Sequence, residues 1–135
     1  MSDAQATYVA VIDIGKTNKK VHIYDERLDL VDSRSETFDS VERDGIPWVA
    51  SEAVEEWLLD TLSQLGSRYA IRLISIATHG ATIAWVGEDG DLAIPVIDYT
   101  YEPGESFQDE FYERCGSPTH LQQATATPKF PALLT

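Results

Sequence analysis

Short runs of β-branched residues and one amphipathic stretch alternate along the chain, which predicts a mixed α/β fold. Residues 8–14 are mostly apolar and end at Gly15, as expected for a buried strand. Apolar residues resume at Val21, so we expect a hairpin that turns at residues 15–18. Residues 28–38 continue the pattern as a third strand, which completes an antiparallel meander.

The most amphipathic segment follows residues 43–47, which we expect to be a loop. Ser51 is placed to cap a helix, and Gly66 is placed to end it. The apolar face between them consists of Val54, Trp57, Leu58, Leu62 and Leu65. Residues 71–77 then read as a strand, and because a helix separates it from the first strand, we expect the two strands to be parallel.

The second half of the chain contains a further hairpin signal. Apolar residues 82–86 and 92–97 flank an acidic turn that contains Gly90, which indicates an inserted hairpin. Residues 128–135 end the sequence on an apolar stretch without a stop signal. We therefore expect the protein to continue beyond them, because free termini are usually polar.

A short helix is predicted over residues 106–114. Ser106 and Asp109 stand at capping-box spacing at its start. Gly116 and Pro118 follow its last residues and are expected to close it.

Composition and charge narrow the class of protein. The chain has 135 residues, a formal net charge of −13, 43% hydrophobic residues and 24% charged residues, which is typical of a soluble globular protein. The acidity argues against nucleic acid or an anionic membrane as a partner, because both favour a basic face. One cysteine, Cys115, excludes an internal disulfide and a cysteine-based zinc site. We expect a cytoplasmic protein.

Three of the chain's four lysines lie at the expected turn between the first two strands. An aspartate at the end of a strand can hold Mg²⁺, and the backbone N–H groups of a tight turn can line an anion site. This composition predicts a magnesium–phosphate site, although a solvated hairpin turn uses the same residue types. The residues of this candidate phosphate site are Asp13, Gly15, Lys16, Thr17, Asn18, Lys19 and Lys20, with Asp13 as the metal ligand.

A different phosphate motif is excluded by its spacing. Gly15-Lys16-Thr17 resembles the end of the G-x-x-x-x-G-K-[ST] loop, which requires a glycine where this chain has Ala10. The residues between them are also a β-branched strand rather than a flexible loop.

The order of elements and several motifs resemble a known family. Three antiparallel strands, a helix and a parallel strand, with Asp-x-Gly at the first turn, are similar to the ribonuclease-H-like core of actin, heat-shock ATPases and sugar kinases. Residues 13–20 resemble the D-x-G-T-[TS]-[SN]-x-[KR] phosphate motif of FGGY-family carbohydrate kinases. Residues 74–81 resemble that family's x-H-G segment, and residues 88–95 its G-x-x-L-x-P hairpin. Residues 111–116 and 127–134 resemble its helix with a Thr-Gly turn and its T-x-x-K-L-L run.

Three departures from the family pattern bear on the substrate. Lys16 stands where the family usually has a small residue, and Cys115 replaces a common threonine. After Pro95 the family has Trp-x-Asp-x-Arg, whereas residues 96–102 contain no arginine. The resemblance therefore indicates a divergent subfamily.

The resemblance implies an activity and a division of the protein. The intact protein would use ATP and Mg²⁺ to phosphorylate a hydroxyl of a sugar, of the ketose or polyol class. Residues 1–135 would be the N-terminal portion of the first of two domains. The catalytic base and the adenosine-binding domain would lie outside them, so the chain alone would be inactive. The implied sugar-binding residues are His79, Gly80, Ala81, Asp98 and Tyr99.

Several alternatives stay open at this point. His79 can be a structural histidine at a strand end, and Asp98 with Tyr99 can simply end a strand. A chaperone-like or actin-like ATPase of the same superfold, and a non-catalytic binding module, remain alternatives to the kinase. The sequence does not determine the oligomeric state, and a homodimer is one option.

Overall fold

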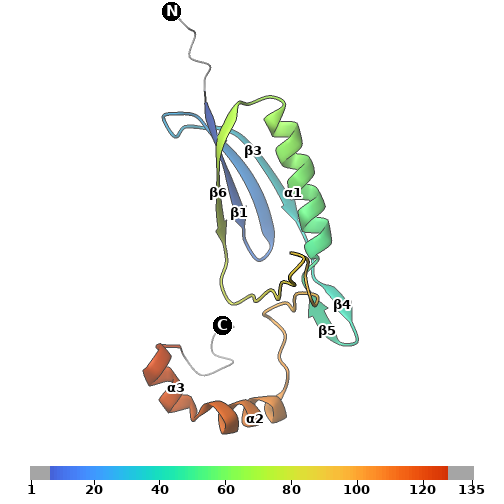
Figure 1. The fold of residues 1–135 in the computed structure, drawn as a ribbon, viewed down its shortest axis with the longest axis vertical. Coiled ribbons are helices and arrows are strands. Elements are labelled where there is room, and N and C mark those ends of the chain that lie inside the picture. Colours follow the sequence, from blue (N-terminus) through green and yellow to red (C-terminus); the bar gives the residue numbers. More distant parts are fainter. Residues whose placement is uncertain (1–6, 128–135) are drawn as a thin grey trace, which may run out of the picture. The chain divides into compact units, whose positions relative to one another are not determined.

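The computed structural model describes residues 7–127 and divides the chain into two compact units, Met1–Ile97 and Asp98–Thr135. No helix in the described part is long and apolar enough to cross a membrane. The elements, shown in Figure 1, are β1 (Tyr8–Ile14), β2 (Asn18–Tyr24), β3 (Leu30–Thr37), β4 (Val41–Arg43), β5 (Ile46–Trp48), α1 (Ser51–Gly66), β6 (Ile71–Thr78), α2 (Glu105–Cys115) and α3 (Pro118–Thr125).

A four-stranded sheet and one helix form the centre of the first unit. The strand order is β3-β2-β1-β6, with β1 antiparallel to β2 and parallel to β6. The meander, the helix and the parallel strand therefore follow one another as the sequence predicts. The predicted bounds of β1 and α1 are also confirmed, while β2 begins at Asn18 rather than at Val21.

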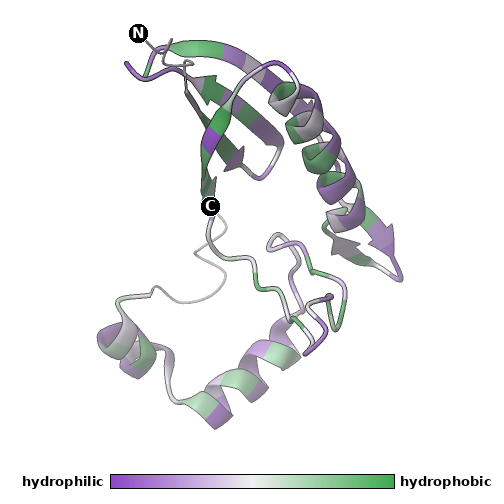
Figure 2. Cartoon of the chain, turned by 45° about the horizontal axis from the view of Figure 1, so that its top comes forward, coloured by the Kyte–Doolittle hydropathy of each residue, from purple (hydrophilic) through white to green (hydrophobic). Residues whose placement is uncertain are grey.

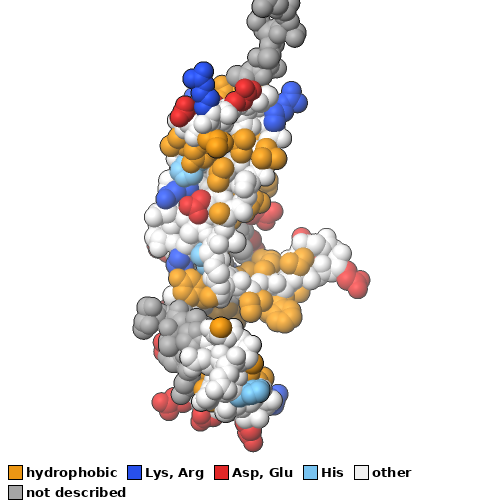
Figure 3. All heavy atoms as spheres, turned by 90° about the vertical axis from the view of Figure 1, so that its left-hand side faces the viewer, with side chains coloured by type: hydrophobic (Ala, Val, Ile, Leu, Met, Phe, Trp, Pro, Cys, Tyr) orange, Lys and Arg blue, Asp and Glu red, His pale blue; other side chains and the backbone are white. Residues whose placement is uncertain are grey.

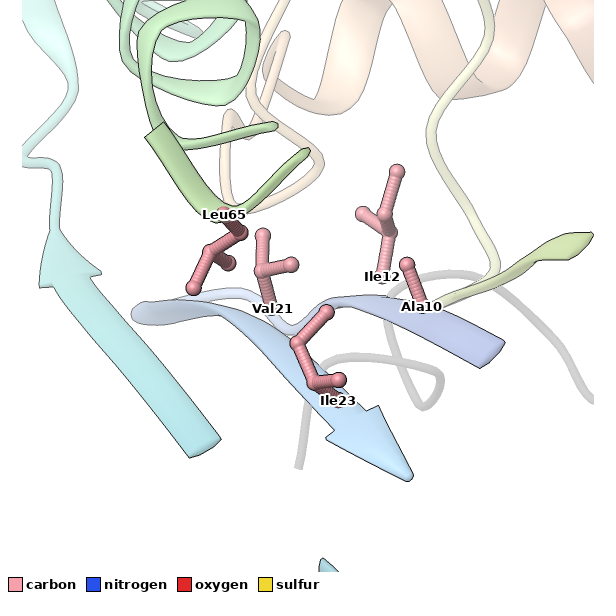
Figure 4. Close-up of a cluster of buried hydrophobic side chains, with 5 residues drawn as sticks. All are labelled: Ala10, Ile12, Val21, Ile23 and Leu65. Carbon is pink, nitrogen blue, oxygen red and sulfur yellow. The ribbon is translucent and has the colours of Figure 1, made fainter. Parts of the chain in front are cut away.

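One face of the sheet carries the hydrophobic core. Ala10 and Ile12 of β1 and Val21 and Ile23 of β2 are buried at alternate positions, and Leu65 from the last turn of α1 completes the cluster (Figure 4). Alternation places them on one face, because successive side chains of a strand point to opposite sides. Figure 2 shows hydrophobic residues on these strands and on turns of α1, with hydrophilic residues between them.

β6 lies at the edge of the sheet and exposes apolar side chains. Leu73, Ile74 and Ile76 are 59%, 51% and 66% exposed. Figure 3 shows hydrophobic side chains at the surface on this side of the molecule.

The segment at residues 43–47 is a hairpin, so the predicted loop is wrong. β4 and β5 pair with Val41 opposite Trp48 and Arg43 opposite Ile46. Asp44 and Gly45 connect them with φ angles of 54° and 75°. Positive φ at both central residues is the requirement of a type I′ turn, which Asp-Gly satisfies well.

α1 begins without a side-chain cap. Ala50 occupies the N-cap position, and Ser51 is the first helical residue, so the predicted cap at Ser51 is wrong. The Val54 N–H donates to the Ala50 carbonyl, which starts the helical ladder. The helix ends at Gly66 as predicted.

The predicted hairpin at residues 82–97 is reduced to a tight reversal. The isolated bridge between Val86 and Leu92 and the hydrogen bond from the Ala93 N–H to the Trp85 carbonyl at 2.8 Å join the two arms. In the turn between them the Gly87 N–H donates to the Asp91 carbonyl at 2.8 Å. Val96 of the second arm is buried, but several other apolar side chains of the arms lie at the surface. Trp85 is 63% exposed, for example.

The described residues of the second unit, 98–127, contain the helices α2 and α3. The N-cap residue of α2 is Gly104 and makes no side-chain cap, so the predicted capping box of Ser106 and Asp109 is wrong. Gly116 ends α2 as predicted. Pro118 does not close that helix but begins α3.

α3 was not predicted, although its start has a recognisable signal. The Ser117 hydroxyl accepts a hydrogen bond from the His120 N–H at 3.2 Å, and Pro118 occupies the first turn. Serine at the N-cap followed by proline at N1 is a common helix start. The predicted T-x-x-K-L-L-like run at residues 127–134 lies outside the described residues except for Thr127.

Asp32 on β3 binds the segment that follows α1. Its Oδ2 is 2.9 Å from Arg68 Nη1 and accepts a hydrogen bond from the Tyr69 hydroxyl at 3.1 Å. Desolvation raises the pKa of Asp32, but the hydrogen bonds from Tyr69 and the Ser33 N–H and the charges of Arg34 and Arg68 outweigh it, so the pKa is lowered. Desolvation and the bond to Asp32 raise the pKa of Tyr69.

Candidate phosphate and sugar site

The turn between β1 and β2 is short and tightly closed. The Gly15 N–H donates to the Asn18 carbonyl at 3.0 Å. A Cβ atom at Gly15 would lie 3.0 Å from that same oxygen, which is tighter than ordinary van der Waals contact. The close approach of the backbone therefore favours glycine here, because a side chain would force the Asn18 carbonyl to shift.

Strand alternation sorts the basic residues of the turn onto different faces. Lys19 pairs with Ile14 and lies on the core face of β2, in line with Val21. Lys20 lies on the opposite face, directly across from Asp13. Residues directly opposite each other in an antiparallel pair have neighbouring side chains, so a carboxylate and an ammonium group share this end of the sheet.

Lys19 is buried, with 5% of its surface exposed. Its Nζ donates to the Gly15 carbonyl at 3.0 Å and to the Lys16 carbonyl at 2.8 Å. Its aliphatic stem therefore occupies a core position while its ammonium group reaches the turn.

The end of β3 supports the turn from the side. The Thr37 hydroxyl donates to the Asn18 side-chain oxygen at 3.0 Å, and the Phe38 N–H donates to the Thr17 carbonyl at 3.4 Å. Lys16 Nζ lies 3.3 Å from the Ser40 hydroxyl. These supporting residues were missed by sequence reasoning. The register of the predicted meander could have indicated them, because Thr37 pairs with Asn18.

His79 lies beside the end of β1. Its N–H donates to the Ile14 carbonyl at 3.1 Å, immediately after β6 ends at Thr78. Its ring Nδ1 is 2.9 Å from the Gly80 carbonyl. With Nδ1 as the donor, the neutral ring presents Nε2 as an acceptor. The structure therefore brings His79 and the candidate phosphate site to the same edge of the sheet.

Two neighbours of His79 differ in their backbone requirements. A Cβ atom at Gly80 would meet nothing within 4 Å, so steric space does not require glycine there. Ala81 has a φ of 63°, in the left-handed region that non-glycine residues rarely adopt. Strain of this kind often occurs at functional sites.

Asp98 and Tyr99 belong to the second unit. Asp98 is 1% exposed, and its Oδ1 accepts hydrogen bonds from the Thr100 N–H at 2.9 Å and the Thr100 hydroxyl at 2.8 Å. The Tyr101 N–H donates to the Asp98 carbonyl at 3.0 Å, which completes a turn. Tyr99 is half-buried.

The donor set for a metal ion consists of one carboxylate, that of Asp13. Within residues 7–127, no group of three or more His, Cys, Asp or Glu side chains could hold a metal ion. Mg²⁺ is usually bound by one or two carboxylates together with water and substrate phosphate, rather than by a cage of protein ligands. A half-buried aspartate beside the candidate phosphate site fits that mode.

Comparison with known proteins finds relatives by structure. No protein-family model matches the chain, and no curated protein matches its sequence. A carbohydrate kinase from Novosphingobium aromaticivorans is 30% identical with a TM-score of 0.73, over 82% of this chain and 23% of that protein. Gluconate kinase from Lactobacillus acidophilus is 18% identical with a TM-score of 0.73, over 88% of this chain and 25% of the kinase. Plasmodium falciparum glycerol kinase with ADP is 19% identical with a TM-score of 0.67, over 87% and 25% of the respective chains.

The matches concern only part of each matched kinase. The chain spans about a quarter of the length of these kinases. Over that part it has the fold of carbohydrate kinases, so the resemblance to carbohydrate kinases that the sequence predicts is confirmed.

Proposed function

We propose that the chain is the N-terminal part of an ATP-dependent sugar kinase of the FGGY type, with a ribonuclease-H-like core. The complete protein transfers the γ-phosphoryl group of ATP to a hydroxyl of a ketose or polyol. The second domain, with the adenosine site and the catalytic base, lies outside these residues. We assign no catalytic base to this chain and expect it to be inactive alone. The proposed setting is the cytoplasm, with no nucleic acid or membrane partner.

The turn between β1 and β2 receives the phosphate groups in this proposal. Phosphoryl transfer depends on positioning and on offsetting negative charge more than on covalent chemistry. Of the turn residues 15–18, Lys16 and Thr17 offer their backbone N–H groups to phosphate oxygens, because the Gly15 N–H already donates to the Asn18 carbonyl. Thr17 and Asn18 add polar side chains. Lys16 and Lys20 offset negative charge, and Lys19 belongs to the same site.

Asp13 holds Mg²⁺, directly or through water. Mg²⁺ held there would offset the negative charge of the phosphate groups. Lys20, directly across from Asp13, limits the net negative charge at this end of the sheet before nucleotide arrives.

The sugar is held by residues after the strand ends. Ligands of open α/β sheets gather at the carboxyl ends of the strands, where His79 and Gly80 follow β6. Nε2 of His79 accepts a hydrogen bond from a sugar hydroxyl, because Nδ1 is oriented toward the Gly80 carbonyl. Ala81, Asp98 and Tyr99 complete the proposed set.

One observation carries the proposal. The His79 N–H donates to the Ile14 carbonyl at 3.1 Å, one residue before the turn that would bind phosphate. A phosphate site and a sugar site must adjoin for a phosphoryl group to pass between them. A chaperone-like or actin-like ATPase gives no reason for a histidine at this position.

The test is an assay of ADP release by the full-length protein with Mg-ATP and a panel of ketoses, aldoses and polyols. Turnover stimulated by one sugar, with the phosphorylated sugar identified by mass spectrometry, is the expected result. ATP hydrolysis that no sugar stimulates would favour the chaperone-like or actin-like ATPase. Binding of a sugar without any ATP turnover would favour a non-catalytic binding module.

A further inference from the structure

A lysine occupies a core position of β2, and its ammonium group must be compensated. Lys19 follows the same alternation as Val21 and Ile23, and it is 5% exposed. A buried charge is costly unless it is hydrogen-bonded. The carbonyls of Gly15 and Lys16, at 3.0 Å and 2.8 Å from Nζ, provide bonds of this kind.

These two hydrogen bonds determine which way the peptide groups of the turn face. In a planar trans peptide, the C=O and the N–H of the same unit point in opposite directions. The Gly15 carbonyl shares its peptide unit with the Lys16 N–H, and the Lys16 carbonyl shares its unit with the Thr17 N–H. Both carbonyls point at Nζ, so both N–H groups point away from Lys19.

We propose that Lys19 is a positioning residue of the phosphate site. It holds the Gly15 and Lys16 carbonyls inward, so that the N–H groups of Lys16 and Thr17 face the bound phosphate. Its ammonium group stays on the carbonyls and does not touch phosphate. Without it, either peptide unit can turn over and present a carbonyl oxygen to an anion. The inference rests on the proposed function, because it assigns Lys19 a role within that site.

Crystal structures of the full-length protein, alone and with Mg-ADP, test the position of the ammonium group directly. We expect Lys19 Nζ within hydrogen-bond distance of the Gly15 and Lys16 carbonyls in both, and out of reach of every phosphate oxygen. A phosphate oxygen bonded to Nζ, or carbonyls turned away from Nζ in the protein alone, would overturn the proposal. This measurement needs no variant, so it remains decisive if substitutions prevent folding.

Variants of the full-length protein test the consequence for binding. Lys19→Met keeps the length of the side chain and removes the donors. It is expected to weaken Mg-ADP binding, measured by calorimetry, on the order of tenfold to a hundredfold. Lys19→Arg retains donors and should recover part of the affinity.

Two controls separate positioning from charge and from stability. Arg27→Met removes one positive charge at an exposed position between β2 and β3 and should leave the affinity unchanged. Val21→Ala removes buried volume on the same face and should lower the melting temperature without weakening Mg-ADP binding. An equal loss of affinity in Val21→Ala and Lys19→Met would mean that Lys19 is merely structural.

Hydrogen exchange distinguishes failure of this inference from failure of the proposed function. Exchange in a peptide covering residues 13–20 should be faster in Lys19→Met than in the wild type, whether or not nucleotide binds. A wild-type protein that binds no Mg-ADP would refute the proposed function. Unchanged exchange in Lys19→Met would refute the positioning of the turn by Lys19.

Discussion

The carboxylate of Asp13 is the group whose removal tests the phosphate site most directly. Asp13→Asn keeps the shape of the side chain and removes the negative charge that would hold Mg²⁺. We expect phosphoryl transfer by the full-length protein to fall at least about a hundredfold, with little change in melting temperature. Glu55→Gln, exposed on α1, is the matched control and should keep full activity. Comparable turnover in Asp13→Asn and wild type would reject Asp13 as the metal ligand.

A substitution at His79 tests the proposed sugar-binding residues. His79→Ala removes the Nε2 acceptor but leaves the backbone bond to Ile14 in place. The KM for the sugar should rise about tenfold or more, because a buried sugar hydroxyl loses its partner. The affinity for Mg-ADP should change much less. His120→Ala, at an exposed position on α3, should alter neither constant. An unchanged KM for the sugar in His79→Ala would mean that His79 is a structural residue.

At the candidate phosphate site, the sequence predicted which residues lie together, but it did not predict which face each side chain occupies or what it contacts. The sequence places Lys16, Lys19 and Lys20 in one basic turn. Alternation in β2 separates Lys19 from Lys20, and this could have been inferred once β2 was taken to begin at Asn18. The hydrogen bond from Lys19 Nζ to the Gly15 carbonyl could not have been inferred from the sequence, because it depends on the conformation of the turn.

Among the elements, the β4–β5 hairpin makes the strictest demand on one residue. Gly45 has a φ of 75°, and an L-residue with a side chain pays about 1–2 kcal/mol to adopt the left-handed region. Gly45→Ala should lower the free energy of unfolding by that amount in urea denaturation. Gly66→Ala, at the end of α1 with open space around its Cβ, should leave stability unchanged or slightly higher. A neutral Gly45→Ala would show that the turn does not need its type I′ geometry.

The contact of β3 with the segment after α1 predicts a pH dependence. The pKa of Asp32 is lowered in the folded protein, so its contribution to stability is present above its usual value of 3.8. That contribution is lost as the pH falls through the lowered pKa, because protonation of the carboxylate weakens its bonds to Arg68 and Tyr69. Asp32→Asn should be less stable than wild type at pH 6, and the difference should shrink toward pH 2. Urea denaturation at several pH values measures it; a difference independent of pH would contradict this prediction.

Helices and strands with a long, regular pattern of apolar residues were predictable. Short elements that depend on the conformation of a turn were not. β1 and α1 match their predicted bounds because burial on the core face requires regular spacing of apolar residues. β4 and β5 were missed although Asp44-Gly45 is a hairpin signal, since strands of three residues are too short to display alternation. Residues 82–97 were predicted to form two strands, but they form only isolated bridges, and several of their apolar side chains are exposed.

At the scale of the whole molecule, the order of the elements was the most predictable property. A helix between two strands of one sheet implies a parallel return, and β6 pairs with β1 in that way. The same order leaves β6 at an edge of the sheet. The exposure of its apolar side chains was not predicted, because the pattern of residues 71–77 indicated only a strand parallel to the first.

This exposed edge predicts how the 135-residue chain behaves in solution. An edge strand with apolar side chains is a template for pairing with another chain, so the sedimentation coefficient should rise with concentration. Ile76→Lys places a charge at a position that is 66% exposed on β6 and should reduce the association. Leu59→Lys makes the same change at a position that is 62% exposed on α1, away from the edge. If both variants reduce association equally, exposed hydrophobic surface in general is responsible; a reduction confined to Ile76→Lys identifies β6 as the point of contact.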